Sequence, residues 1–306
     1  MKIRVLGSAA GGGFPQWNCN CRNCSGVRNG TLRARPRTQS SVTVSGRDEH
    51  QWALVNVSPD ILAQLQANPV LQPARAPRDT AISGIVLVDG QIDHSAGLFM
   101  LRESSAALQI WCTDNVYADL TRGNPVFGVL AHYCGVQRRG MTPDGSEFAV
   151  DGVGGVYWRA LAVAGKPAPY SPNRESPVAG DNVALVLGDR GSGQTAVYAP
   201  GLASMDQRLW GAMQSAACVL VDGTFWSDDE MIRLGLSRKR ARDIGHLPQS
   251  GPGGMLEWLD KLSPGTRRIL IHVNNTNPIL DESSPEHAEL TRRGIEVAWD
   301  GLEIEL

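Results

Sequence analysis

The sequence predicts a four-layer α/β sandwich, in which two β-sheets pack face to face and helices cover both outer faces. Apolar strand patterns come in adjacent runs with helical segments between them, and this order recurs in two similar halves. The 34 glycines among 306 residues indicate many tight turns, and hence many strands. No linker-like or low-complexity segment divides the halves, so we expect residues 1–306 to form a single domain.

Composition and charge exclude several classes of protein. Hydrophobic residues make up 42% of the chain and charged residues 20%, as is usual for globular proteins. The formal net charge of -2 argues against nucleic acid or an anionic membrane surface as a partner. No segment approaches the ~20 uninterrupted apolar residues of a membrane span, and the apolar part of the N-terminus is too short for a signal peptide. We therefore expect a cytoplasmic protein.

The first half of the chain begins as a strand that runs into a glycine-rich loop over residues 7–13. This loop lacks the GK[ST] ending of a Walker phosphate loop and is not a Rossmann loop. Ser58 suits the N-cap and Pro59 the first position of the helix that follows a predicted hairpin. In order, the sequence predicts strands over 2–6, 40–45, 51–57, 80–88 and 107–112, with helices over 58–67 and 115–122.

The second half shows a similar order of elements, although no repeat of the sequence itself is detectable. A proline-rich loop over 166–177 follows its first strand. The sequence predicts strands over 156–163, 182–187, 195–199, 218–221, 268–271, 295–299 and 302–306, with helices over 209–217, 228–234, 254–262 and 284–293.

An Asp-His pair follows the buried strand pattern of residues 85–88. The turn Asp89-Gly90 ends this strand, Asp93 and His94 come next, and residues 95–101 have the composition of a helix start. A pair at this position is held by a rigid strand and opens to a cleft, where open α/β sheets place their sites. The alternative is that Asp93 only caps the following helix.

Two further apolar strand patterns end in groups that bind metals. The pattern over 218–221 ends at Asp222, and that over 268–271 ends at His272. Imidazole and carboxylate together are the ligand set of zinc, iron and manganese. Two histidines and a carboxylate with open positions are also the ligands of mononuclear non-haem iron(II), which activates dioxygen. We therefore predict an active-site metal held by Asp93, His94, Asp222 and His272.

Three of the six cysteines lie close together, in the pattern Cys19-x-Cys21-x-x-Cys24, and a basic, polar stretch follows as far as Arg37. In a reducing compartment such a cluster indicates a metal site rather than a disulfide framework. Three thiolates supply most of a tetrahedral zinc site, which needs one more ligand. We expect a structural zinc ion here.

The strand-end motifs resemble those of the metallo-β-lactamase superfamily, whose first metal motif is H-x-H-x-D-H after a strand. The aligned stretch here is Asp89-Gly-Gln-Ile-Asp-His94, in which Asp89 and Gln91 replace the two leading histidines. Asp222 is similar to the superfamily's bridging aspartate, and His272 to its last histidine. The resemblance implies a metallo-β-lactamase-like αββα fold.

The departures from this motif imply different chemistry. A hydrolytic site of the superfamily uses two metals to make hydroxide and to clamp the substrate. The intermediate histidine is also absent, and Asn182 lies in its region, so one of the two metal positions should be weak or empty. These departures argue against ordinary metallohydrolase chemistry. Around the remaining ion, but not bound to it, we expect Asp89, Gln91, Asn182 and Asn274.

The cysteine cluster resembles that of the superfamily's carbon-phosphorus-lyase phosphodiesterase branch. There the fourth ligand is a histidine three residues after the last active-site histidine, and this offset falls on Asn275. Asn275, a water molecule and a rearranged His272 are the alternatives for the fourth zinc ligand. Related enzymes also keep a proton-shuttling histidine in a glycine-bounded loop, which implies general acid/base work or a substrate contact for His246. The alternative for His246 is a surface loop histidine.

Long strings along the whole chain resemble the PqqB family of pyrroloquinoline quinone (PQQ) biosynthesis. They include residues 5–21, Gln91-Ile-Asp-His94, Tyr198-Ala-Pro-Gly-Leu202 and residues 271–280. The family implies a role in making PQQ from a Glu-Tyr unit cut from a precursor peptide. Two functions attach to it: carrying PQQ or its precursor towards the periplasm, and iron- and oxygen-dependent hydroxylation of the tyrosine ring.

The residues favour hydroxylation, although a carrier would keep the same pocket. Adding oxygen to a tyrosine ring needs an activated oxidant, which the sparse His/Asp site suits, whereas nothing in the chain spans or grips a membrane. We expect a metal-dependent oxygenase with Fe(II) or another divalent metal, beside the structural zinc. Its ligand would be Glu-Tyr or PQQ, and a homodimer is compatible with the sequence. The basic segment 238–242 either neutralises substrate carboxylates or forms a solvated face.

Overall fold

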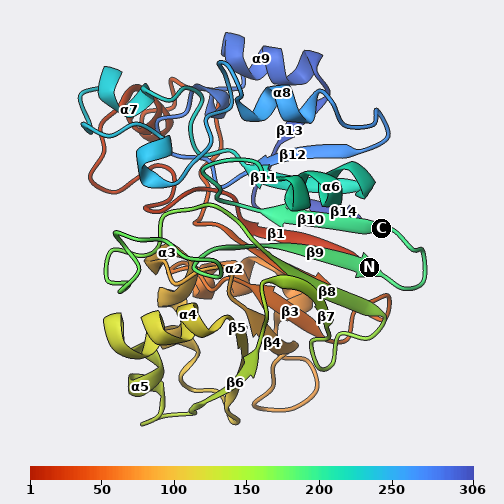
Figure 1. Ribbon diagram of the computed structural model, residues 1–306. Coiled ribbons are helices and arrows are strands. Elements are labelled where there is room, and N and C mark those ends of the chain that lie inside the picture. Colours follow the sequence, from red (N-terminus) through yellow and green to blue (C-terminus); the bar gives the residue numbers. More distant parts are fainter.

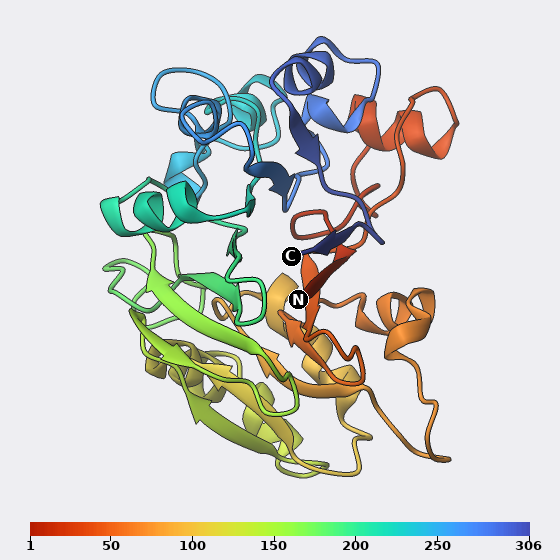
Figure 2. The same cartoon turned by 90° about the vertical axis from the view of Figure 1, so that its right-hand side faces the viewer.

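The computed structural model describes residues 1–306 and contains two seven-stranded mixed β-sheets (Figure 1). The last strand of the chain joins the first sheet beside the first strand. Ile3 pairs with Ile304 in antiparallel register, and the two chain ends lie close together (Figure 2). In spatial order the first sheet contains β14 (Glu303–Glu305), β1 (Lys2–Gly7), β2 (Ser41–Ser45), β3 (Trp52–Val55), β4 (Ile82–Val86), β5 (Leu108–Cys112) and β6 (Val136–Gly140).

The second sheet is arranged like the first, with three antiparallel and three parallel strand pairs. Parallel neighbours matter for the site, because their carboxyl ends meet at one edge of the sheet. In spatial order this sheet contains β13 (Ile295–Val297), β12 (Arg267–Ile271), β11 (Cys218–Asp222), β10 (Thr195–Ala199), β9 (Val183–Asp189), β8 (Val156–Ala162) and β7 (Asp144–Phe148).

Helices cover the outer faces of both sheets, which confirms the four layers predicted from the sequence. The helices are α1 (Arg22–Arg28), α2 (Ile61–Ala67), α3 (Ile92–Ser95), α4 (Asp114–Ala118), α5 (Val126–Leu130), α6 (Gln207–Ser215), α7 (Glu230–Arg233), α8 (Met255–Leu259) and α9 (Pro285–Arg292). None of them is both long enough and apolar enough to cross a lipid bilayer.

Three apolar cores separate the four layers. The core between the sheets joins side chains of both, such as Val44 and Trp158. A second core packs α2, α4 and α5 against the first sheet, and includes Ile61. A third packs α6, α8 and α9 against the second sheet, and includes Leu209 and Leu290. In Figure 1 these two sets of helices lie on opposite sides of the strands.

Some local predictions are wrong or incomplete. Helix α2 begins at Ile61 after Asp60, so Ser58 is not its N-cap; the Ser58 hydroxyl donates to Gln64 Oε1 at 3.1 Å instead. Helices α1 and α5 and strands β6 and β7 were not expected from the sequence. Strands β6 and β7 lie at sheet edges, where Val136-Gln-Arg-Arg-Gly140, for example, shows none of the apolar alternation that marks a half-buried strand.

Asp93 and His94 lie inside the short helix α3, not before a helix. The N-cap position of α3 belongs to Gln91, so the capping role considered for Asp93 is wrong. A 3-10 turn continues the chain from Ala96 to Leu101. Both side chains are therefore carried by a helical turn that follows directly on a buried strand.

Candidate metal centre

Strand ends bring the predicted ligands together. β11 and β12 are parallel neighbours, and Asp222 lies beside Ile271 in their register, so Asp222 and His272 leave the second sheet at the same edge. The loop after β4 of the first sheet carries Asp93 and His94 on α3 to this place. The ligand atoms of Asp93, His94 and His272 all lie within 4.8 Å of one another.

His94 is oriented by Asp89. Its Nδ1–H group donates to both carboxylate oxygens of Asp89, at 2.8 and 2.9 Å. In the neutral imidazole this contact fixes the tautomer and places the lone pair on Nε2. Nε2 is buried without a hydrogen-bond partner and lies 3.8 Å from Asp93 Oδ2. A buried, unpartnered lone pair that faces a carboxylate fits a bound cation, and Asp89 lies on the opposite side of the imidazole ring from Nε2.

His272 completes this first group. Its Nε2 lies 3.2 Å from Asp93 Oδ2. Thr224 Oγ1 donates to the His272 carbonyl oxygen at 3.0 Å and lies 2.9 Å from Nδ1, so Nδ1–H donates to the hydroxyl and Nε2 keeps its lone pair. The backbone of His272 is left-handed, with φ 61°, which costs a non-glycine residue on the order of 1 kcal/mol. Such strain is typical of functional sites.

Asp222, His246 and His272 form a second group of ligand atoms within 4.8 Å of one another. His246 Nδ1 lies 2.9 Å from Asp222 Oδ2 and 3.1 Å from Thr224 Oγ1. Asp222 is fully buried and also accepts hydrogen bonds from the backbone N–H groups of Thr224, at 2.9 Å, and Leu202, at 3.2 Å. His246 is therefore not a surface loop histidine. Thr224 was missed in the sequence, although it lies only two residues beyond Asp222.

Opposite charges shift the pKa values of these groups. Burial alone would lower the pKa of His94, but the carboxylates of Asp89 and Asp93 raise it to about 9. Burial opposes ionisation of Asp93, yet the positive charge of His94 holds the pKa of that carboxyl below its usual range. In the same way the pKa of Asp222 is lowered and that of His246 is raised. Protons on the imidazoles thus balance the carboxylates, and a divalent cation would displace them.

A cavity of about 270 Å³ opens onto both groups. Lys166 and Arg174 line it, and neither forms an ion pair with a carboxylate; Arg174 donates to the Pro167 carbonyl oxygen. The basic segment 238–242 does not line this cavity and lies mostly at the surface, where Arg240 pairs with Asp228. The cations that a substrate would meet are therefore Lys166 and Arg174, which the sequence did not indicate.

The other polar residues expected near the metal also line this cavity. Gln91 Nε2 donates to the Lys166 carbonyl oxygen at 3.0 Å, so the side chain is held at the rim. Asn182 lies before β9, and its buried Nδ2 has no hydrogen-bond partner. Asn274 lies two residues after His272. Neither Gln91 nor Asn182 supplies the imidazole that a second metal position would need.

The three cysteines converge as predicted, with the Sγ atoms of Cys19, Cys21 and Cys24 within 4.8 Å of one another and no disulfide between them. Asn275 lies against them, with Nδ2 3.1 Å from Cys19 Sγ and 3.3 Å from Cys24 Sγ. A half-turn of the amide would present Oδ1, which can bind zinc, in place of Nδ2. His272 faces Asp93 instead, so Asn275 is the better placed of the two protein alternatives for a fourth ligand.

The segment from His272 to Asn277 contacts both clusters. His272 belongs to the group with Asp93 and His94, and Asn275 contacts the cysteines. Asn277 Nδ2 donates to the Gly223 carbonyl oxygen, next to the end of β11, at 2.9 Å. Asn23 of α1 donates to the carbonyl oxygens of Asn275, at 3.1 Å, and of Asn277, at 2.9 Å. The cysteine-bearing helix and the active-site strand ends are thus tied to the same six residues.

Comparison with known proteins identifies the family. A family model described as beta-lactamase superfamily domain matches residues 51–273. The coenzyme PQQ synthesis protein B of Azoarcus sp. (strain BH72) is 61% identical over 306 residues, and the alignment covers 100% of each chain. The chain belongs to the coenzyme PQQ synthesis protein B family. The family member from Methylobacillus flagellatus is 56% identical over 305 residues, with 99% of each chain covered.

Solved structures agree with this family and with the fold. The crystal structure of Zn²⁺-bound PqqB from Methylobacterium extorquens superposes with a TM-score of 0.90, at 36% sequence identity and with 100% of both chains covered. A diphosphatase from the PhnP family has a TM-score of 0.69 at 17% identity, covering 100% of this chain and 97% of its own, and shares the fold. The zinc in the relative from the PqqB family and the two clusters here together support metal binding by this chain.

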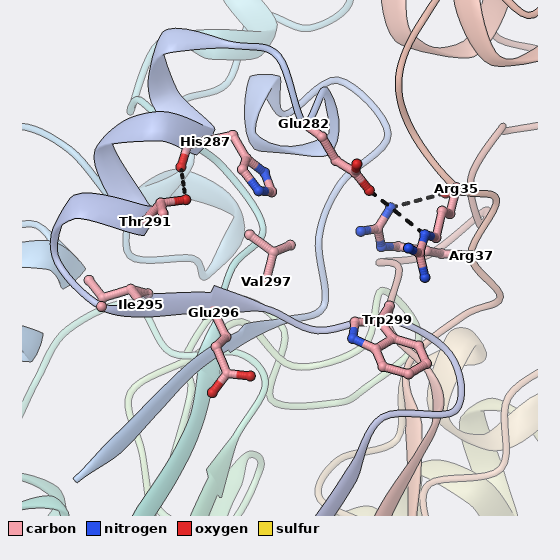
Figure 3. A pocket seen from close by; sticks show the side chains of 10 residues that line it. Arg35, Arg37, Glu282, His287, Thr291, Ile295, Glu296, Val297 and Trp299 are labelled. Carbon is pink, nitrogen blue, oxygen red and sulfur yellow. Dashed lines mark hydrogen bonds and ion pairs between the residues drawn. The ribbon is translucent and has the colours of Figure 1, made fainter. Parts of the chain in front are cut away.

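A larger cavity, of about 440 Å³, lies away from these clusters between Trp299, Arg35 and α9 (Figure 3). Both of its carboxylates are already paired with arginine: Glu282 lies 3.7 Å from Arg35, and Glu296 lies 2.6 Å from Arg267. Its one histidine, His287, donates from Nδ1 to the Ile279 carbonyl oxygen at 2.8 Å. No second imidazole and no thiol converges there, so the smaller cavity is the candidate site.

Proposed function

We propose that this chain acts in PQQ biosynthesis as a metal-dependent oxygenase that hydroxylates the tyrosine ring of a Glu-Tyr unit derived from a precursor peptide. The observation that carries the proposal is the group of Asp93, His94 and His272, in which two imidazole lone pairs and a carboxylate face one point. This is the ligand set of mononuclear iron(II) sites that leave positions open. Iron(II) bound there would supply the activation of dioxygen.

The same residues argue against a hydrolytic pair of metals. Asp89 and Gln91 stand where the superfamily motif has its first two histidines, and both are engaged elsewhere, Asp89 by His94 and Gln91 by the Lys166 carbonyl oxygen. A second metal position would therefore lack the two leading imidazoles of the superfamily motif, and the second ligand group offers only His246 beside the shared His272. Asp222, expected to be a further ligand of the single metal, groups with His246 and His272 instead of with Asp93 and His94.

The cavity suits an acidic aromatic substrate. Lys166 and Arg174 are cations without carboxylate partners, and a Glu-Tyr unit carries carboxylates that would pair with them. Phe225 and Ile244 supply apolar surface on which an aromatic ring can pack. His246 lines the same space and is hydrogen-bonded to Asp222, so we assign it the transfer of protons to or from the substrate.

The second candidate is a carrier that only binds PQQ or its precursor and assists its transport to the periplasm. The two unpaired cations favour it as much as they favour Glu-Tyr, because PQQ is a tricarboxylate and could also ligate an open metal position. Tight binding of PQQ to the protein, without any change in Glu-Tyr under iron and oxygen, is the result that this candidate requires.

The deciding experiment is oxygen consumption with product analysis. Protein loaded with iron(II) under anaerobic conditions is mixed with Glu-Tyr, ascorbate as two-electron reductant, and oxygen. One oxygen atom should enter the ring in place of hydrogen, and the other should leave as water after taking up two electrons and two protons. His94→Ala and His272→Ala should abolish turnover, whereas His132→Ala, which removes an exposed imidazole, should not. Equal turnover in all three variants would rule the proposal out.

A further inference from the structure

A buried carboxylate lies close to the cavity without a cationic partner. Glu230 on α7 is 4% exposed and forms no ion pair. Its Oε2 accepts from the backbone N–H of Trp226 at 2.7 Å, and its Oε1 accepts from the Thr276 hydroxyl at 2.5 Å. Burying a carboxylate in this way costs several kcal/mol unless its hydrogen bonds compensate for the loss of hydration. This cost indicates that Glu230 has a role other than packing.

These contacts lead from Glu230 to the candidate site. Asn274 Nδ2 lies 2.5 Å from Thr276 Oγ1. Ionised Glu230 can only accept, so Thr276 donates its single hydroxyl proton to Glu230, and the hydroxyl oxygen accepts from the Asn274 amide nitrogen. The amide oxygen of Asn274 is then free to bind a ligand. Asn274 Oδ1 has no partner within the protein, is not sealed from solvent, and belongs to a residue that lines the cavity beside His272.

We propose that Asn274 is a substrate-orienting residue whose Oδ1 accepts a hydrogen bond from a hydroxyl group of the bound ligand, and that Glu230 positions it through Thr276. The identity of that hydroxyl, the tyrosine phenol, rests on the function proposed above. Without the contact to Thr276 the amide could turn and present a donor instead of an acceptor. The direction of the hydrogen bonds that start at Glu230 thus decides which ligand group Asn274 recognises.

Glu230→Gln tests the direction without removing the contacts. Glutamine has one acceptor oxygen, and this oxygen accepts the hydrogen bond from the backbone N–H of Trp226. The amide nitrogen must then face Thr276 and donate to its hydroxyl oxygen. Thr276 then donates to Asn274 Oδ1, and Asn274 turns its Nδ2 to the cavity. A phenol donates more strongly than it accepts, so recognition of the ligand hydroxyl should weaken although every side chain keeps its place.

The measurement is the affinity of zinc-loaded protein, which cannot turn over by redox chemistry, for Glu-Tyr and for Glu-Phe by calorimetry. It is made at about pH 8.5, where Glu230, whose pKa is raised to about 7 by burial, is ionised. The wild-type protein should bind Glu-Tyr roughly three- to tenfold more tightly, the range of one added hydrogen bond. Asn274→Ala and Thr276→Val should bind the two peptides about equally, Glu230→Gln should show a reduced preference, and Thr276→Ser should retain it. Thr291→Val, on the exposed face of α9, is the matched control for loss of a threonine hydroxyl.

Each outcome separates this inference from the proposed function. A preference that disappears in Asn274→Ala, with no turnover by iron-loaded wild-type protein, supports the inference and refutes the hydroxylase. Turnover of Glu-Tyr with an unchanged preference in Asn274→Ala refutes the inference alone. Absence of any preference in the wild-type protein overturns the inference too, as does loss of the active-site metal from Asn274→Ala, which would make Asn274 a ligand.

Discussion

Replacing Glu230 by glutamine should stabilise the protein at alkaline pH. Burial is the main reason why the pKa of this carboxyl rises from 4.5 to about 7 in the folded protein, and the hydrogen bonds from Thr276 and Trp226 only partly oppose the rise. A difference of this size corresponds to about 3 kcal/mol of folding free energy. Glutamine fills the same space and carries no charge at any pH, so the variant does not bear this cost.

The direction follows from proton binding in the two states. The unfolded chain releases the Glu230 proton near pH 4.5, whereas the folded protein holds it up to about pH 7. Between these values the folded state binds more protons, so the free energy of unfolding falls as the pH rises. Below this window the wild-type and glutamine side chains are both neutral in both states. Above it the wild-type protein bears the full cost of a buried negative charge.

Urea unfolding of the two proteins at about pH 5 and about pH 8 measures the effect. The stability of Glu230→Gln relative to wild type should increase by about 2.5 kcal/mol between these two pH values. Both proteins keep the cysteine cluster and the active-site histidines, so the pH dependence of those groups cancels in the comparison. Glu257→Gln, at an exposed position on α8, is the matched control. A stability difference that is the same at both pH values would refute the buried-charge reasoning.

Three further predictions concern the metals. Cys21→Ser should lose about one zinc ion per chain and melt at a lower temperature, while the folded fraction still binds iron at His94 and His272. If the variant keeps its zinc and its stability but loses hydroxylation, the cysteines are catalytic. Asp89→Asn should weaken binding of the active-site metal roughly 10- to 100-fold, measured by competition with a chelator, because the amide supports His94 less well than a carboxylate; unchanged affinity would show that Asp89 does not orient His94. Because the pKa of His94 is raised to about 9, Mn²⁺ must displace its proton, and the apparent affinity should rise roughly tenfold per pH unit from about pH 6.5 to about pH 8.5; an affinity that does not change with pH would contradict this competition.

Residues at strand ends could be predicted from the sequence because two simple rules combine there. Uninterrupted apolar runs mark buried strands, and the carboxyl ends of parallel strands meet at one edge. Asp222 and His272 follow such runs directly, so their proximity needs no knowledge of loops. The fold class followed from the same runs. Asp89 was also expected beside the metal, because it stands at the first position of the motif that contains Asp93.

Residues whose position depends on loop conformation could not be predicted in this way. His246 reaches Asp222 from a loop 24 residues further along the chain, and no periodicity constrains such a contact. Lys166 lies in a proline-rich segment that carries no strand or helix pattern, so its place in the cavity wall has no local signal. Thr224 looks like any residue of a turn, and its role depends on two imidazoles that the fold brings to its hydroxyl.

The segment from His272 to Asn277 has a practical consequence for anyone who prepares this protein. His272, at one end of this segment, belongs to the group with Asp93 and His94, and Asn275, in its middle, contacts the cysteine cluster. Occupancy of one metal site should therefore influence metal affinity at the other, and by thermodynamic linkage this influence is reciprocal. A batch purified with too little zinc would then still bind the active-site metal, but with lower affinity, even though every active-site side chain is intact. Metal content should therefore be counted at both sites before any rate is compared between preparations.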